Sequence, residues 1–187
     1  MLNLGCSMSR NVFFSVPFLL AFVATSALGA DPKPAPAPAK AAALKDQLVG
    51  TWMLTESKLE YADGKKEEAG GGDEKGIAMF DAQGNFTWLI MGAARKPFKA
   101  NNRMEGTLDE YKGAVQGTVA YWGTYTVNEA EKSVSFTIAR SVFPNWDGTT
   151  RKSTITVAGD ELKQVNAPIP SAKGPYVPKL VWKRAKP

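Results

Sequence analysis

The sequence predicts an all-β fold, an eight-stranded antiparallel up-and-down barrel accompanied by one short helix. Three observations favour it. From Leu48 onward, short runs rich in β-branched and aromatic residues are separated by turn signals at modest spacing, as in sandwiches and barrels. The unit glycine, threonine, aromatic occurs at residues 50–52 and again at residues 123–125. Residues 132–140 alternate apolar with small polar side chains, which is typical of a strand with one buried face.

We expect eight strands at residues 50–60, 75–81, 84–91, 121–128, 132–140, 151–158, 160–166 and 178–185. The second and third are joined by DAQG, residues 81–84, which has Asp at the first and Gly at the fourth position of a type I turn. Pairing Asp81 with Gly84 places Met79 near Phe86 and Ile77 near Trp88. All four apolar side chains then share one face of the hairpin.

Two other segments are predicted from composition and spacing. Residues 65–75, KKEEAGGGDEK, are charged and glycine-rich, as in a mobile loop. Residues 107–120 predict a short helix that closes or flanks the barrel, with Thr107 as N-cap and Leu108, Tyr111 and Val115 at helical spacing. Gly113 and Gly117 each weaken that helix by about 1 kcal/mol relative to alanine.

The first 30 residues differ in composition from the rest and predict a secretory signal. Arg10 precedes an uncharged run at residues 12–30 that ends in small residues, a pattern typical of bacterial export. We therefore expect a periplasmic or secreted protein without stable membrane insertion once the signal is cleaved. An uncleaved membrane anchor is the alternative, because the run is almost long enough to span a bilayer. Residues 31–46, rich in proline and alanine, predict a linker, and residues 47–187 the barrel domain.

Composition excludes several classes of function. The chain has no histidine, which removes the commonest general base and the commonest zinc ligand, so we expect no metal site, no cofactor and no catalytic residues. Its one cysteine, Cys6, lies within the predicted signal, so no disulfide is expected. The net charge of +5 comes from cations scattered among acidic residues, which indicates an ordinary solvated surface and no nucleic-acid partner.

The motifs occur in an order that resembles the bacterial lipocalin-like domain family from Leu48 to Ala185: LVGTW, a DG loop, the GIAMFDAQGNF hairpin, a helix with EY, then YWGTYTV, FPNWDGT and LVWKR. The resemblance implies a closed, calycin-like eight-stranded barrel that holds an apolar small molecule. Gly50 and Trp52 match the GxW signature of lipocalins, in which the tryptophan packs under a basic side chain from the last strand. Arg184 is the matching cation, so these three residues are expected to seal one barrel end. Relatives often have a histidine where this chain has Phe136 and Thr137.

Strand parity predicts which side chains face a cavity. On the fifth strand, Phe136 and Arg140 share the apolar, inward face. The expected register places Tyr125 opposite Phe136, and Tyr121 and Arg151 on either side of Arg140. Two arginines and a phenol would then converge, which favours a bound carboxylate, sulfate or phosphate. The chemistry is similar to that of intracellular fatty-acid-binding barrels.

Each of these residues also has a purely structural interpretation. Both arginines lie at strand ends where they reach water, one bulge would reverse their direction, and Asp147 could pair with either. Trp88 either lines the cavity or is plain core. Phe143, Pro144 and Trp146 form a flap at the barrel mouth or cap the barrel without any ligand.

The sequence therefore favours an exported protein that binds a small molecule inside a barrel, either a hydrophobic one or an amphipathic one such as an anion. The first alternative is a cofactor-independent barrel enzyme of the cyclase or isomerase type, with Tyr121, Tyr125, Glu56 or Glu60 as acid or base. The second is a protein-interaction module of the cell envelope, with the proline-rich linker reaching a partner. A small molecule that copurifies with the protein would distinguish a carrier from an interaction module.

Overall fold

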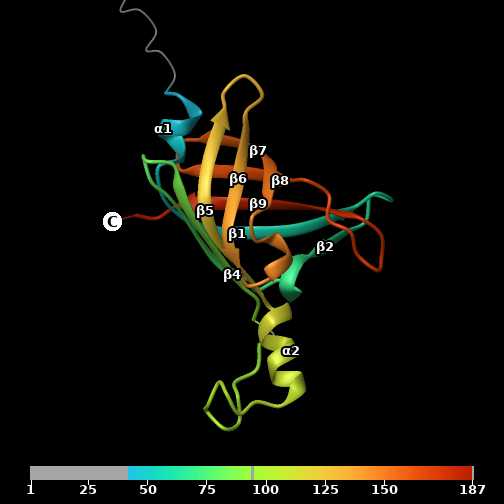
Figure 1. Cartoon of the computed structure of the whole chain (residues 1–187). Helices are drawn as coiled ribbons and strands as arrows, with labels where there is room; N and C mark the ends of the chain where they lie inside the picture. Colours follow the sequence, from blue (N-terminus) through green and yellow to red (C-terminus); the bar gives the residue numbers. More distant parts are fainter. Residues whose placement is uncertain (1–41, 94, 187) are drawn as a thin grey trace, which may run out of the picture. The chain divides into compact units, whose positions relative to one another are not determined.

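The computed structural model describes residues 42–93 and 95–186, and it forms a closed antiparallel barrel of eight strands (Figure 1). The predicted signal and most of the predicted linker lie outside the described residues. The strands are β1 (Gly50–Tyr61), β2 (Lys66–Glu68), β3 (Lys75–Phe80), β4 (Asn85–Met91), β5 (Thr118–Asn128), β6 (Ser133–Ser141), β7 (Thr150–Ala158), β8 (Glu161–Asn166) and β9 (Tyr176–Arg184). The helices are α1 (Leu44–Leu48), α2 (Leu108–Gln116) and the short 3₁₀ turns η1 (Ala69–Gly71) and η2 (Pro144–Trp146).

The barrel closes through the first strand. Residues 50–53 of β1 pair with β3 and residues 52–61 pair with β9, so the ring β1, β3 to β9 has no free edge. This confirms the predicted fold class. Residues 65–75 were expected to be a loop, and that prediction is wrong in part. The short strand β2 extends the sheet beside the end of β1, and Ala69 of η1 is buried.

The hairpin between β3 and β4 differs from the predicted register by one residue. Asp81 N–H donates to Asn85 O at 3.0 Å, so Phe80 pairs with Phe86 and Ala78 with Trp88. Gly84 has φ +94° and adds a third residue to the loop, as in hairpins with a left-handed final position. A one-residue slip turns every side chain over, which is why Phe80 is buried and Met79 is exposed.

The inner face of the barrel forms an aromatic core. Trp52, Trp88, Trp182 and Phe136 are almost fully buried. The rings of Trp88 and Trp182 meet edge to face with centroids 5.0 Å apart, an arrangement worth about 0.5–1.5 kcal/mol beyond the area it buries. No disulfide is available to this core, so packing supplies its stability.

Helix α1 covers one end of the barrel. Trp52 Nε1 donates to Leu48 O at 2.8 Å, and Arg184 Cζ lies 4.2 Å above the centre of the indole. Arg184 also donates from Nη1 to Val49 O at 2.9 Å, and a Cβ at Gly50 would lie 2.8 Å from that nitrogen. Glycine is therefore required there. The linker was expected to reach residue 46, but α1 begins at Leu44, which is buried.

Helix α2 begins where the sequence predicts. Thr107 accepts a hydrogen bond from Glu110 N–H and the Glu110 carboxylate accepts one from Thr107 N–H, which completes a capping box. The helix was expected to close or flank the barrel, but α2 has no buried residue and Leu108 and Val115 face solvent, so it does not pack on the barrel wall. Val119, expected on the same helix, lies in β5.

In the part of the chain that the structure describes, no helix combines the length and the apolar character needed to cross a lipid bilayer.

Candidate functional site

A cavity of about 320 Å³ opens at the barrel end opposite Trp52. Its wall includes the starts of β5, β7 and β9, whereas Trp52 and Arg184 lie at the start of β1 and the end of β9. The inner part of the wall is an aromatic floor formed by Trp88, Tyr121 and Phe136. The cavity can therefore bury an apolar molecule against three rings.

The three rings of the aromatic floor pack against one another and against Phe86. The rings of Trp88 and Tyr121 stack 5.7 Å apart with an interplanar angle of 17°, and Phe136 meets Trp88 edge-on at 5.7 Å. Phe86 packs edge-on against Phe136 at 4.9 Å from the layer beneath. A flat apolar molecule would meet a preformed surface and would not have to order it.

Arg151 and Lys152 are the cations of the cavity wall, which also includes Glu74, and Lys152 is paired with Glu131. Arg151 Cζ lies 4.4 Å from the ring centre of Trp146, in η2, and this contact holds the side chain at the mouth. Among the described residues, Arg151 has no carboxylate oxygen within 4 Å and no hydrogen-bonded partner. A half-buried guanidinium with five free donors is suited to an oxyanion.

Two phenols share this region of the cavity with Arg151. Burial raises the pKa of Tyr121 well above its usual range, and the neighbouring guanidinium only partly opposes that rise. Burial likewise raises the pKa of Tyr176, again against the effect of Arg151. Both phenols therefore stay protonated at neutral pH and are hydrogen-bond donors on the cavity wall.

The expected convergence of Arg140 with Arg151 is wrong. A β-bulge at Ala139 shifts the register, so that Gly123 pairs with Ile138 but Trp122 pairs with Arg140. Arg140 then points away from the cavity, 73% of its side chain is exposed, and its Nε lies 3.9 Å from Asp147 Oδ2. The pairing of β6 with β7 also differs from the expected register, by four residues. Arg151 therefore lies opposite Phe136.

Other candidate residues lie elsewhere. Tyr125 pairs with Phe136 as expected, but its hydroxyl donates to Asp81 O at 2.7 Å near the closed end. A second bulge, between Leu54 and Glu56, turns Glu56 and Glu60 outward, where they pair with lysines. The four acid or base candidates of the enzyme hypothesis therefore do not converge.

A polar wall of three side chains was not predicted from the sequence. Gln164 Nε2 donates to Asn166 Oδ1 at 2.6 Å and to Ser153 Oγ at 3.2 Å, and Ser153 donates to Asn166 at 2.7 Å. Ser153 and Asn166 line the cavity, while Gln164 is buried behind them and its Oε1 has no partner among the described residues. The sequence pattern could have identified this wall, because Leu162, Gln164 and Asn166 alternate along β8 and so face the same side of the sheet.

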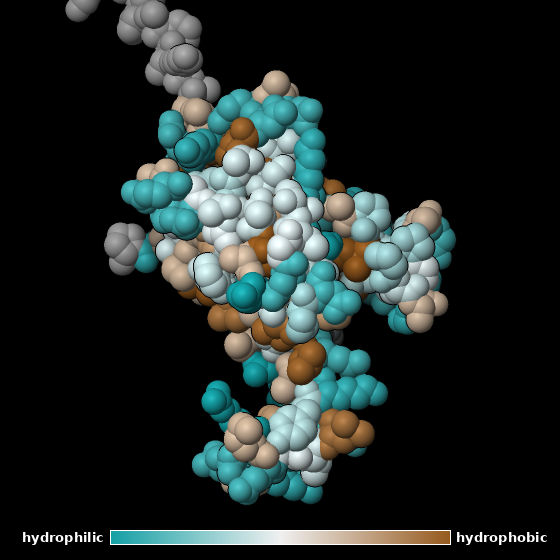
Figure 2. Space-filling model, in the orientation of Figure 1, coloured by the Kyte–Doolittle hydropathy of each residue, from teal (hydrophilic) through white to brown (hydrophobic). Residues whose placement is uncertain are grey.

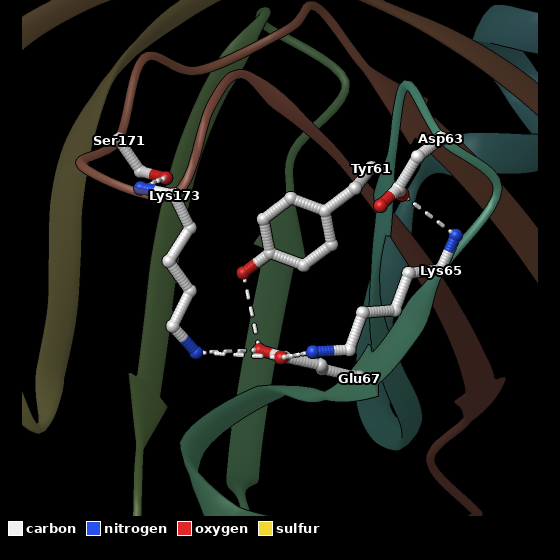
Figure 3. A network of polar contacts seen from close by, with 6 residues as sticks. All are labelled: Tyr61, Asp63, Lys65, Glu67, Ser171 and Lys173. Atoms are coloured by element: carbon white, nitrogen blue, oxygen red, sulfur yellow. Dashed lines mark hydrogen bonds and ion pairs between the residues drawn. The ribbon is translucent and has the colours of Figure 1, made fainter.

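A mouth latch ties together two segments beside the opening: Glu67 with its partners Tyr61, Lys65 and Lys173 (Figure 3). Tyr61 Oη donates to Glu67 Oε2 at 3.1 Å, and Lys173 Nζ lies 3.3 Å from both carboxylate oxygens. Lys173 belongs to the loop between β8 and β9, which contributes Ala167 and Ile169 to the cavity wall. The latch therefore fixes one side of the mouth.

Residues 49–185 match the family model described as a lipocalin-like domain. The match runs from just before β1 to just after β9. The chain belongs to the lipocalin-like domain family. No curated protein matches this lipocalin-like chain.

Solved structures similar to this lipocalin-like domain include two from Bacteroides and one designed protein. A lipocalin-like protein from Bacteroides uniformis is 15% identical with a TM-score of 0.40, over 74% of this chain and 99% of that one. An uncharacterised protein from Bacteroides eggerthii is 16% identical with a TM-score of 0.38, over 74% and 99% of the two chains. A redesigned β-barrel, mFAP1, bound to DFHBI, is 13% identical with a TM-score of 0.36, over 76% and 100%.

In this lipocalin-like barrel, the cavity wall includes four of the residues predicted to meet a ligand: Trp88, Tyr121, Phe136 and Arg151. Arg140 and Tyr125 lie outside it.

Proposed function

We propose that the protein binds a small amphipathic anion in the barrel cavity. The apolar body of the ligand would lie on the aromatic floor, and its acidic group would face Arg151, Tyr121 and Tyr176. The observation that carries this proposal is the position of Arg151, a cation on the cavity wall without a carboxylate partner among the described residues. A partly buried charge of this kind favours a counter-ion.

The size of the cavity restricts the ligand. About 320 Å³ lies at the lower end of the volumes usual for small-molecule sites, roughly 300–1,000 Å³. A compact aromatic or short-chain acid fits that volume better than a long-chain lipid. Burial of its apolar surface would contribute about 25 cal/mol per Å², less the cost of ordering the ligand.

The test compares two fluorescent probes of similar shape. Anilinonaphthalenesulfonate carries a sulfonate, and phenylnaphthylamine is its uncharged analogue. Arg151→Met should weaken binding of the sulfonate by about tenfold or more, because a charge-assisted contact is lost, and should leave the neutral probe nearly unaffected. Arg140→Met serves as the matched control, since Arg140 faces away from the cavity.

Two outcomes would contradict the proposal. Equal affinity for the sulfonate in the wild type and in Arg151→Met would show that Arg151 does not bind the anion. A wild-type protein that binds neither probe would remove the ligand-binding function itself.

We further propose that the protein acts in the periplasm or outside the bacterial cell. The support is the uncharged run at residues 12–30 after Arg10, with small residues at its end. Cell fractionation and the mass of the purified protein test it. Recovery from the cytoplasmic fraction at the full-length mass would contradict export.

A further inference from the structure

Between β4 and β5 the chain makes an excursion that we call the arm, residues 95–117 with α2 (Figure 1). The arm has its own small core, in which Phe98 and Tyr111 meet edge-on at 5.3 Å. Tyr111 Oη accepts a hydrogen bond from Gly106 N–H at 2.8 Å, and Glu110 Oε1 accepts one from Lys99 N–H at 2.9 Å. These contacts hold the loop of the arm against α2.

The arm exposes large apolar side chains. Leu108 is 81% exposed, Met104 75% and Val115 54%. They belong to a segment whose helix has no buried residue, so burial inside the protein does not explain them. Figure 2 shows hydrophobic and hydrophilic residues side by side on this part of the molecule.

The same arm carries an excess of cations. It has five, Arg95, Lys96, Lys99, Arg103 and Lys112, against three carboxylates, Glu105, Asp109 and Glu110. The Glu110 carboxylate is already engaged by the backbone N–H groups of Thr107 and Lys99, which lower its pKa. Within the described residues, none of the five cations has a carboxylate oxygen within 4 Å, whereas Lys65, Lys173 and Lys179 on the barrel are paired.

We propose that the arm docks on an anionic lipid bilayer. Exposed leucine and methionine side chains can enter the interfacial region of a bilayer, while nearby lysine and arginine bind its acidic headgroups. A bilayer is favoured over a protein partner because it offers both chemistries to apolar side chains spread along the arm, without requiring a shaped groove. The free cations provide the charge complementarity.

The base of the arm adjoins the ligand cavity. Gln116 and Gly117, at the end of α2, belong to the cavity wall. Docking of the arm would therefore bring the mouth close to a lipid surface. The docking itself does not depend on what the cavity holds, so the two proposals can fail separately.

The experiment measures flotation of the folded protein with vesicles of phosphatidylcholine alone or mixed with phosphatidylglycerol. We expect binding to the mixed vesicles only, weakening as salt is raised. Leu108→Gln should reduce partitioning about tenfold, because a leucine side chain is no longer buried. Lys99→Gln with Arg103→Gln should reduce it by about fivefold for each charge removed.

Met79→Gln is the matched control, because Met79 is exposed on β3 of the barrel. It should leave vesicle binding unchanged. Absence of binding to phosphatidylglycerol vesicles, or an equal loss with Met79→Gln and Leu108→Gln, would overturn the proposal. Sulfonate probe binding should be the same in wild type and Leu108→Gln, which separates failure of docking from failure of the cavity.

Discussion

Trp52 and Trp182 are both buried indoles, yet their polar atoms differ in a way that mutation can reveal. Trp52 Nε1 donates to Leu48 O, and its ring carries the Arg184 guanidinium. Trp182 Nε1 is buried with no hydrogen-bond partner among the described residues. Keeping an unpaired donor out of water costs free energy, whereas the paired donor contributes to stability.

We therefore predict that Trp52→Phe lowers the free energy of unfolding by at least about 1 kcal/mol more than Trp182→Phe does. Both substitutions remove a similar volume from the core, so each serves as the control for the other. Urea denaturation followed by circular dichroism measures the difference. Equal losses would contradict the assigned roles of the two indole nitrogens.

Arg140 and Arg151 show how one inserted backbone residue changes the direction of a side chain. Both were expected to face inward from strand parity. One bulge at Ala139 turns Arg140 to solvent, whereas Arg151 keeps its inward parity and rests on Trp146. Sequence alternation identifies a face only as far as the first bulge.

The mouth latch connects the β1–β2 extension with the β8–β9 loop. Hydrogen bonds from Lys65, then Tyr61 and Lys173, lower the pKa of Glu67 from its ordinary value of 4.5 to about 2. Because the pKa of Glu67 is lower in the folded protein than in the unfolded chain, its ionised carboxylate stabilises the fold. This stabilisation is complete at a pH above the pKa in the unfolded chain. That stabilisation is lost as the pH falls from about 4.5 towards 2. Glu67 is therefore ionised at neutral pH, and the latch loses its ion pairs as this carboxylate is protonated in acid.

We predict that the backbone amide shifts of residues 171–174 titrate with a midpoint near pH 2 in the wild type. Lys173→Met should raise this midpoint towards 4.5, though not fully, because Lys65 and Tyr61 remain bonded to Glu67. Lys163→Met, which removes a barrel ion pair away from the latch, should have no effect. NMR titration tests this. A wild-type midpoint near 4.5 would show that the latch does not form in solution.

Helix α2 marks the limit of prediction at the level of elements. Its start was predictable because the capping box is local, formed by Thr107 and Glu110 three residues apart. Its position was not, because the spacing of Leu108, Tyr111 and Val115 is the same whether a helix packs on a barrel or extends from it.

At the scale of the whole molecule, ring closure separates two ends with different chemistry. One end is sealed by α1, Trp52 and Arg184, where the indole N–H and two guanidinium nitrogens donate to backbone carbonyls of residues 47–49. The other leaves a guanidinium and two phenols facing a cavity. A fixed closed end and an open polar mouth are suited to binding one small molecule from one direction.

The sequence alone determined where most strands lie along the chain, the helix cap and the glycine-tryptophan motif. Each of these depends on residues within a few positions of one another. Only the tertiary structure decided the details of strand pairing: the loop length at Gly84, the bulges at Ala139 and Thr55, and the four-residue shift of β7 against β6. The physical reason is that side-chain direction alternates at every residue, so one inserted position anywhere in a closed ring redistributes the side chains between cavity and solvent.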